Sequence, residues 1–245
     1  MLKTGTEENI VLEAATCIAG RIFKAIDQRG FCTLVLAGGN SPRKLYRLFA
    51  DGIPRNDSSP AILPWQSIML FWGDERCVPA NHPDSNYRMA CESLIAAADV
   101  PNQNIFPMPH VTGDYDAAAR SYERELKRFF LRQKQDLRDS FPVFDVIILG
   151  MGPDGHTASL FPGDKNAQAE SNRWVLPVHV PHGSPPGYRL SLTFPVINNA
   201  NNVVFFVTGE SKENMVLDIT SGHRPDLPAG MVKPEHGQLI WFYGK

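Results

Sequence analysis

Residues Thr33–Ala50 read TLVLAGGNSPRKLYRLFA and place an apolar run, a glycine turn and a helical segment in succession. The run Thr33–Ala37 is bounded by glycine and is typical of a buried strand. Apolar side chains then recur with helical spacing over Arg43–Ala50, where Ser41 is the expected N-cap and Pro42 the first helical residue. The stretch therefore predicts a strand, a tight turn and a helix, which form one unit of an α/β fold.

The same alternation continues along the rest of the chain. Strands are expected over Ser67–Trp72, Phe144–Leu149, Asn202–Thr208 and Gln238–Tyr243, and helices over about 10–29, 84–98, 114–129 and 212–219. Strands that alternate with helices indicate a parallel sheet covered by helices on both faces. Since no linker or repeat divides the chain, we expect a single domain over residues 1–245.

Composition argues against several classes of partner. Of 245 residues, 43% are hydrophobic, and the net charge of −2 points neither to nucleic acid nor to an anionic membrane surface. No signal peptide and no membrane-spanning run is expected, so the cytoplasm is the expected location. The four cysteines have neither zinc-site nor disulfide spacing, and Cys77, without a histidine near it in sequence, is the lesser candidate for a nucleophile.

Two loops that follow predicted strands carry groups suited to an anion. Parallel strands end at one edge of a sheet, where ligands bind. Gly38–Pro42 combines glycines with the positive end of a helix, although a tight turn without a ligand would have the same residues. In Gly73–Arg76, Arg76 could grip a phosphate and Asp74 could orient a hydroxyl or a catalytic base, while a surface salt-bridge cluster is the alternative.

The loop Gly150–Thr157 carries the most chemical information. Its three glycines have the GxGxxG spacing of dinucleotide sites, but no strand that follows ends in an acidic residue at the required distance. We instead predict a catalytic strand-turn-helix in which His156, where the helix begins, takes a proton from water beside the Asp154 carboxylate. A helix-capping aspartate with an incidental histidine is the alternative.

Other charged residues have simpler interpretations. Arg189 and Lys212 could each neutralise a phosphate, or could be solvated cations. His179 and His182 form an HxxH pair without an evident third ligand, so no metal site is expected there. The alternating charges of the helix after Asp114, Glu123 among them, are expected to form a solvated face.

Five segments, taken in order, resemble 6-phosphogluconolactonases. They are LAGGNSPRKLY at 36–46, FWGDERCVP at 71–79, DSNYRMA at 84–90, LGMGPDGHTASLFPG at 149–163 and RLSLTFPVINNA at 189–200. The string DGHTASLFPG is the most specific, and the resemblance covers nearly the whole chain. It implies a three-layer α/β/α fold with a mostly parallel open sheet, related to sugar-phosphate deaminases and isomerases.

The resemblance also implies an activity and a site. The reaction would be hydrolysis of 6-phosphogluconolactone to 6-phosphogluconate in the oxidative pentose phosphate pathway, with no metal and no organic cofactor. The implied site consists of the general base His156, the supporting acid Asp74, the phosphate-holding Arg76 and Lys212, the site-lining Arg189, and the loop residues Gly38, Gly39, Asn40 and Ser41. Asp154, the carboxylate beside His156, completes the catalytic residues that we expect. A small sugar phosphate is the one expected partner, and a monomer or a weak homo-oligomer is expected.

Two other functions fit parts of the sequence. An aminosugar-phosphate deaminase or isomerase shares the fold and the Asp-Gly-His turn, but Thr157–Pro162 lacks the acidic residue that would assist the histidine in ring opening. A non-catalytic sugar-phosphate sensor of a transcription regulator would need a DNA-binding module, for which the chain has neither a spare segment nor a basic excess.

Overall fold

The computed structural model describes residues 1–54, 59–133, 137–181, 183 and 185–245. Within them, a main sheet of six parallel strands has the order β1-β9-β8-β5-β2-β3. The strands are β1 Leu2–Gly5, β2 Cys32–Leu36, β3 Ile68–Trp72, β5 Val146–Leu149, β8 Asn202–Thr208 and β9 Gln238–Gly244. The four strands at the centre of this order are almost wholly buried, as expected for apolar runs covered on both faces.

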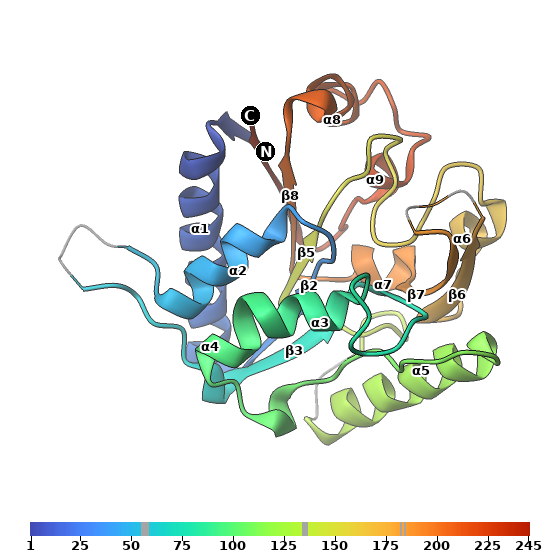
Figure 1. Cartoon of the computed structure of the whole chain (residues 1–245), viewed down its shortest axis with the longest axis horizontal. Coiled ribbons are helices and arrows are strands. Elements are labelled where there is room, and N and C mark those ends of the chain that lie inside the picture. Colours follow the sequence, from blue (N-terminus) through green and yellow to red (C-terminus); the bar gives the residue numbers. More distant parts are fainter. Residues whose placement is uncertain (55–58, 134–136, 182, 184) are drawn as a thin grey trace.

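Helices cover both sides of the main sheet. They are α1 Glu7–Arg29, α2 Pro42–Asp51, α3 Asn86–Ala90, α4 Ala96–Ala98, α5 Tyr115–Arg132, α6 Lys165–Ala169, α7 Phe194–Asn198, α8 Glu213–Thr220 and α9 Pro228–Met231. A π-helical turn at Cys91–Ile95 joins α3 to α4, and 3₁₀ turns lie at Trp65–Ser67, Asn102–Asn104 and Glu210–Lys212. Helix α1 lies on one side of the sheet and α5, α8 and α9 on the other (Figure 1), which confirms the three-layer α/β/α fold.

The ends of the first two helices show how local sequence sets their bounds. Thr6 accepts a hydrogen bond from the Asn9 N–H at the start of α1, and Gly30 ends that helix in the left-handed conformation. Pro42 is the first residue of α2, as predicted. Ser41, in contrast, makes no capping hydrogen bond, because its backbone is already helical and its Oγ accepts a hydrogen bond from the Thr208 hydroxyl at 2.9 Å.

A second, antiparallel sheet was not predicted from the sequence, and neither was the edge strand β1 of the main sheet. The order of the second sheet is β4-β7-β6, with β4 at Asp74–Arg76, β6 at Val175–Val180 and β7 at Gly187–Leu192. The expectation of a loop at Gly73–Arg76 is therefore wrong beyond Gly73. The chain leaves β3 at this glycine, whose carbonyl accepts the Leu192 N–H, and pairs at once with β7.

The predicted helix at His156 is also absent from the described residues. Turns follow β5, and the next helix is α6, which starts at Lys165. Gly155 and Ala158 have φ angles of +80° and +47°, which a right-handed helix cannot contain. The motif is thus a strand followed by a long structured loop.

The expected solvated face of α5 is partly buried in the structure. Its apolar residues point inward as predicted, but the Glu123 carboxylate accepts the Trp174 N–H at 2.9 Å and pairs with Lys127 at 2.6 Å. Glu123 therefore anchors the beginning of β6 to α5.

Candidate active site

A cleft opens at the carboxyl ends of the main strands, where the three loops singled out by the sequence meet. Of the predicted site residues, those that line it are Gly38, Gly39, Asn40, Ser41, Asp74, Arg76, His156, Arg189 and Lys212. Asp154 contacts His156 from the same loop. Residues as far apart in the chain as Gly38 and Lys212 therefore converge, because parallel strands end at one edge.

The first loop presents backbone and a helix terminus to the cleft. Gly39 has a φ of +84°, which favours glycine, and lets the chain turn from β2 toward α2. The hydroxyl of Ser41 is held by Thr208, at the end of β8. The loop therefore places the positive end of α2 at the cleft, an arrangement suited to an anion.

His156 is oriented by Asp154. Its Nδ1 lies 2.6 Å from Asp154 Oδ1, and the same oxygen accepts the His156 backbone N–H at 3.2 Å. With Nδ1 engaged by a carboxylate, Nε2 is the ring nitrogen left for a proton-transfer partner. The His156 side chain is one quarter exposed, so water can reach it.

Gly152 provides the space for this pair. A Cβ atom at Gly152 would lie 2.1 Å from His156 Cε1, 2.2 Å from Nδ1 and 2.8 Å from Asp154 Oδ1. Gly152, the second glycine of the GxGxxG pattern, is therefore needed to leave room for His156 and Asp154, which is a reason unrelated to dinucleotide binding.

We expect Gly152→Ala to lower kcat by at least about tenfold for a reaction in which His156 transfers a proton. The reason is that the added methyl group displaces His156 from Asp154, and a misplaced catalytic group loses much of its effect. Steady-state kinetics on the purified variant measure this. Gly20→Ala, on the open surface of α1, adds the same methyl group where nothing lies within 4 Å and should leave kcat unchanged. Equal kcat values for wild type and Gly152→Ala would contradict the steric argument.

Asp74 is buried and fixed on both carboxylate oxygens. Its Oδ2 accepts the Ser159 hydroxyl at 2.6 Å, and its Oδ1 accepts the Asn86 amide at 3.2 Å. A Cβ atom at Gly38 would lie 2.1 Å from Asn86 Oδ1, so this glycine makes room for the Asn86 side chain. Because Asp154 occupies His156 Nδ1, the geometry favours Asp154 over Asp74 as the residue that orients His156.

Glu75 does not belong to the cleft, although it lies beside Asp74 in sequence. Its carboxylate accepts the N–H groups of Asn86 and Tyr87 at 2.8 and 2.7 Å and the Ser85 hydroxyl at 3.1 Å. Burial raises the pKa of Glu75, while the backbone N–H groups act in the opposite direction. Glu75 therefore fixes the beginning of α3, and with it Asn86.

Arg76 and Arg189 are cross-strand neighbours on β4 and β7. Arg76 Nη1 donates to the Asp84 carbonyl at 2.6 Å, and Arg189 Nη2 donates to the Pro185 carbonyl at 3.0 Å. Within the described residues, the buried Nε of each has no hydrogen-bond partner. Burial lowers the pKa of Arg189, and the Asp74 charge opposes that shift. Two guanidinium groups with unused donors are suited to a phosphate.

Lys212 brings a third cation to the cleft, from the 3₁₀ turn after β8. Burial lowers its pKa, and no carboxylate within the described part of the chain forms an ion pair with it. A half-buried ammonium without a partner gains from an anionic ligand, because the ligand would offset the lost hydration.

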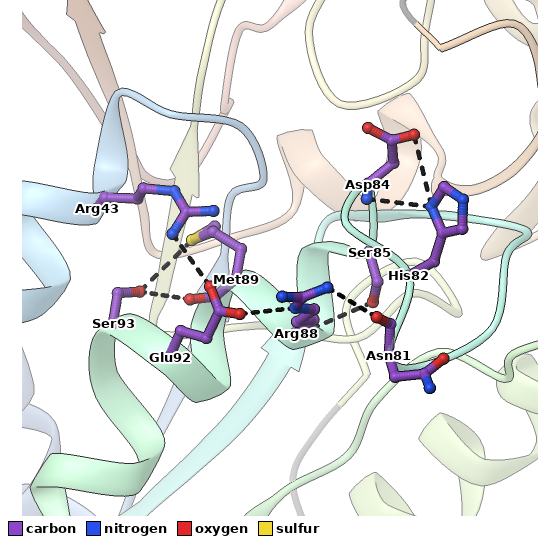
Figure 2. A network of polar contacts seen from close by, with 9 residues as sticks. All are labelled: Arg43, Asn81, His82, Asp84, Ser85, Arg88, Met89, Glu92 and Ser93. Carbon is purple, nitrogen blue, oxygen red and sulfur yellow. Dashed lines mark hydrogen bonds and ion pairs between the residues drawn. The ribbon is translucent and has the colours of Figure 1, made fainter.

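A polar network holds α3 and the loop before it in place (Figure 2). Arg43 of α2 pairs with Glu92 at 3.4 Å, and Glu92 accepts the Arg88 Nε at 2.6 Å. Arg88 Nη1 in turn donates to the Asn81 carbonyl at 2.8 Å. The network thus links α2 to the loop whose residue Asp84 contacts Arg76.

Several residues at or near the site were not predicted as site residues from the sequence. Asn86, Ala158 and Gly152 line the cleft, and Ser159 fixes Asp74. Asn86 and Ser159 lie in the strings DSNYRMA and DGHTASLFPG, so the motifs contained the signal, but spacing alone did not say which neighbours face the cleft.

His179 and Cys77, which the sequence also singled out, do not line the cleft. His179 is on β6 and stacks on Tyr188, while His182 lies outside the described residues. Burial raises the pKa of the Cys77 thiol to about 12, which disfavours it as a nucleophile.

In the part of the chain that is described, no three His, Cys, Asp or Glu side chains could together hold a metal ion. Nor is any helix there long and apolar enough to cross a membrane.

The fold and the cleft define an α/β protein with an anion-binding site and a histidine–aspartate pair at the carboxyl edge of its sheet. The family model described as glucosamine-6-phosphate isomerases/6-phosphogluconolactonase matches residues 5–241. The chain belongs to this family.

Individual relatives agree with this assignment. The chain is 42% identical over 234 residues to a 6-phosphogluconolactonase from Synechocystis sp., covering 95% of this chain and 90% of the relative. It is 37% identical to the chloroplastic 6-phosphogluconolactonase 3 of Arabidopsis thaliana, covering 98% of this chain and 71% of the relative. The crystal structure of 6-phosphogluconolactonase from Thermotoga maritima is similar with a TM-score of 0.82 at 30% identity, covering 100% and 99% of the two chains.

Proposed function

We propose that this protein hydrolyses 6-phosphogluconolactone to 6-phosphogluconate, a step of the oxidative pentose phosphate pathway. The observation that carries the proposal is the His156–Asp154 pair at 2.6 Å beside a cleft lined by three cations, in a chain whose relatives are named for this activity. A base near neutral pH and a site for a phosphate are the two elements that the reaction needs.

In the proposed reaction, His156 Nε2 removes a proton from water as the water oxygen attacks the lactone carbonyl carbon. Asp154 stabilises the imidazolium that forms and keeps the ring in the required tautomer. Collapse of the tetrahedral intermediate breaks the bond to the ring oxygen, which takes the proton back from His156. The carboxylic acid product then ionises, so each turnover releases one proton to solution.

The remaining residues have proposed roles that follow from charge and position. Arg76, Arg189 and Lys212 hold the phosphate, and the loop Gly38–Ser41 contributes its N–H groups. Asp74, fixed by Ser159 and Asn86, accepts a hydrogen bond from a sugar hydroxyl. Loop N–H groups or a cation stabilise the oxyanion, a contribution that is among the largest in acyl transfer.

The decisive experiment generates the lactone in situ and follows proton release with and without the protein. We expect release well above the spontaneous rate. A parallel assay for ammonia from glucosamine 6-phosphate separates the aminosugar-phosphate alternative, since a deaminase would release ammonia and leave the lactone rate unchanged. Tight binding of 6-phosphogluconate without turnover of the lactone would instead support a sensor.

The location, oligomeric state, nucleic-acid binding and cofactor requirement of the protein stay predictions. They are a cytoplasmic location, a monomer or weak homo-oligomer, no nucleic-acid partner and no cofactor. The small sugar phosphate is the partner that the family assignment supports.

A further inference from the structure

Phe161 contacts both a base and a cation of the site. Its ring lies 4.3 Å from the His156 ring, centroid to centroid, with an interplanar angle of 28°, so the two rings are stacked. The Arg189 guanidinium carbon lies over the same ring, 5.5 Å from its centroid. His156 and Arg189 come from different elements and both line the cleft. The phenyl ring of Phe161 therefore contacts both His156 and Arg189.

The backbone around Phe161 is fixed by the residues just before it. Thr157 and Leu160 exchange backbone hydrogen bonds at 3.3 and 2.9 Å, and the Thr157 hydroxyl donates to the Gly150 carbonyl at 2.8 Å. The Ser159 hydroxyl binds Asp74. Pro162 follows and restricts the conformation of Phe161. The backbone that carries the ring is therefore held by the turn, independently of the two side chains that the ring contacts.

The face of an aromatic ring carries partial negative charge and attracts cations. In the hydrolysis proposed above, on which this inference rests, His156 becomes an imidazolium when water loses its proton. The stacked ring then faces a positive charge that is absent in the resting, neutral base. A contact that strengthens as the charge develops lowers the barrier rather than only the energy of the bound substrate.

We propose that Phe161 is a positioning residue whose ring face stabilises the His156 imidazolium during the reaction and holds Arg189 beside it. Asp154 holds the edge of the imidazole at Nδ1, and Phe161 covers a face of the ring. Phe161 thereby limits rotation of the imidazole about its hydrogen bond to Asp154.

Phe161→Leu tests the proposal. Because cation–π contacts of this kind are worth about 0.5–2 kcal/mol, we expect kcat to fall by about two- to thirty-fold. We expect KM to change less, since Arg189 keeps its bond to the Pro185 carbonyl. Phe161→Tyr, which keeps the ring, should restore most of kcat. The matched control is Phe31→Leu, because Phe31 also lies under an arginine, Arg29 at 5.8 Å, but stands at the opposite end of β2. It should leave kcat and KM unchanged.

A fluorine series separates the electronic effect from packing. Incorporation of 4-fluoro-, 3,5-difluoro- and 3,4,5-trifluorophenylalanine at position 161 weakens the ring's attraction for cations while nearly preserving its shape. We expect kcat to fall stepwise with each fluorine. A flat series would overturn the proposal, whatever the Leu variant does, because it would show that the ring acts by shape alone.

The stack has a readout that does not depend on activity. The ring current of Phe161 should shift the NMR signal of the His156 Cε1 proton upfield, and Phe161→Leu should remove that shift. An unshifted signal in the wild-type protein would overturn the stacking itself. Failure of wild-type protein to hydrolyse the lactone, with the shift present, would instead count against the proposed function.

Discussion

Replacing His156 by Ala should lower kcat for lactone hydrolysis by about 10²–10⁴-fold, the usual contribution of a general base, while KM stays close to the wild-type value. The reason is that, in the proposed reaction, His156 acts on the attacking water and not on the phosphate. The residual rate would come from the cations and the N–H groups of the cleft, which the substitution leaves in place. Initial-rate kinetics on the purified variant give both constants.

A matched control for this variant is His236→Ala. His236 is exposed just before β9, at the end of the sheet opposite the cleft, and should be replaceable without effect. Wild-type kcat in His156→Ala would contradict the assignment of the base. A large rise in KM without a fall in kcat would show that His156 binds the substrate and does not activate water.

Replacing Arg189 by Met should raise KM for the phosphorylated lactone by about 10–100-fold. Hydrogen bonds to charged groups are worth about 1.5–3 kcal/mol, and Arg189 offers a buried guanidinium whose Nε has no hydrogen-bond partner within the described residues. The effect should nearly vanish with the unphosphorylated gluconolactone, because that substrate has no phosphate to lose contact with. Rates with the two lactones, measured side by side, isolate the phosphate contact.

Arg132→Met controls for the loss of one positive charge, since Arg132 is exposed in the last turn of α5. It should change neither rate. An Arg189→Met variant that loses the same factor with both lactones would contradict the phosphate role and would place Arg189 at the reacting carbonyl.

The strands of the main sheet, except the edge strand β1, could be predicted from the sequence because they follow a simple rule. A run such as Thr33–Ala37 is apolar after its first residue, as expected for a strand buried on both faces, and Gly38 and Pro42 mark the turn and the helix that follow. Convergence of the three loops then follows from the geometry of parallel strands. The positions of Gly38, Asp74 and His156 at one cleft were predicted for this reason.

The antiparallel sheet could not be predicted in the same way. β4 is only three residues long and its sequence, Asp-Glu-Arg, is charged, so neither its length nor its composition is typical of a strand. It forms because β7 pairs with it from more than 100 residues away. Such long-range pairing leaves no local pattern, and it is this pairing that sets Arg76 beside Arg189.

The different roles of Asp74, Glu75 and Asp154 could not be predicted from the sequence either. Asp74 and Glu75 are adjacent, yet Asp74 faces the cleft and Glu75 accepts the first N–H groups of α3, because successive residues of a strand point to opposite faces. Asp154 and Asp74 were equal candidates to orient His156. The structure separates them, because Asp154 contacts His156 Nδ1, whereas both carboxylate oxygens of Asp74 accept hydrogen bonds from Ser159 and Asn86.

The central claim, direct attack of water on the lactone, is tested most directly by a single turnover in ¹⁸O-labelled water. Protein is mixed in excess over freshly generated 6-phosphogluconolactone and quenched before spontaneous hydrolysis becomes significant. Mass spectrometry then locates the label. We predict one ¹⁸O atom in the carboxylate of 6-phosphogluconate in this first turnover. An unlabelled product, with ¹⁸O instead in the side chain of Asp74 or Asp154, would show that a protein carboxylate attacks the lactone first and would contradict the claim.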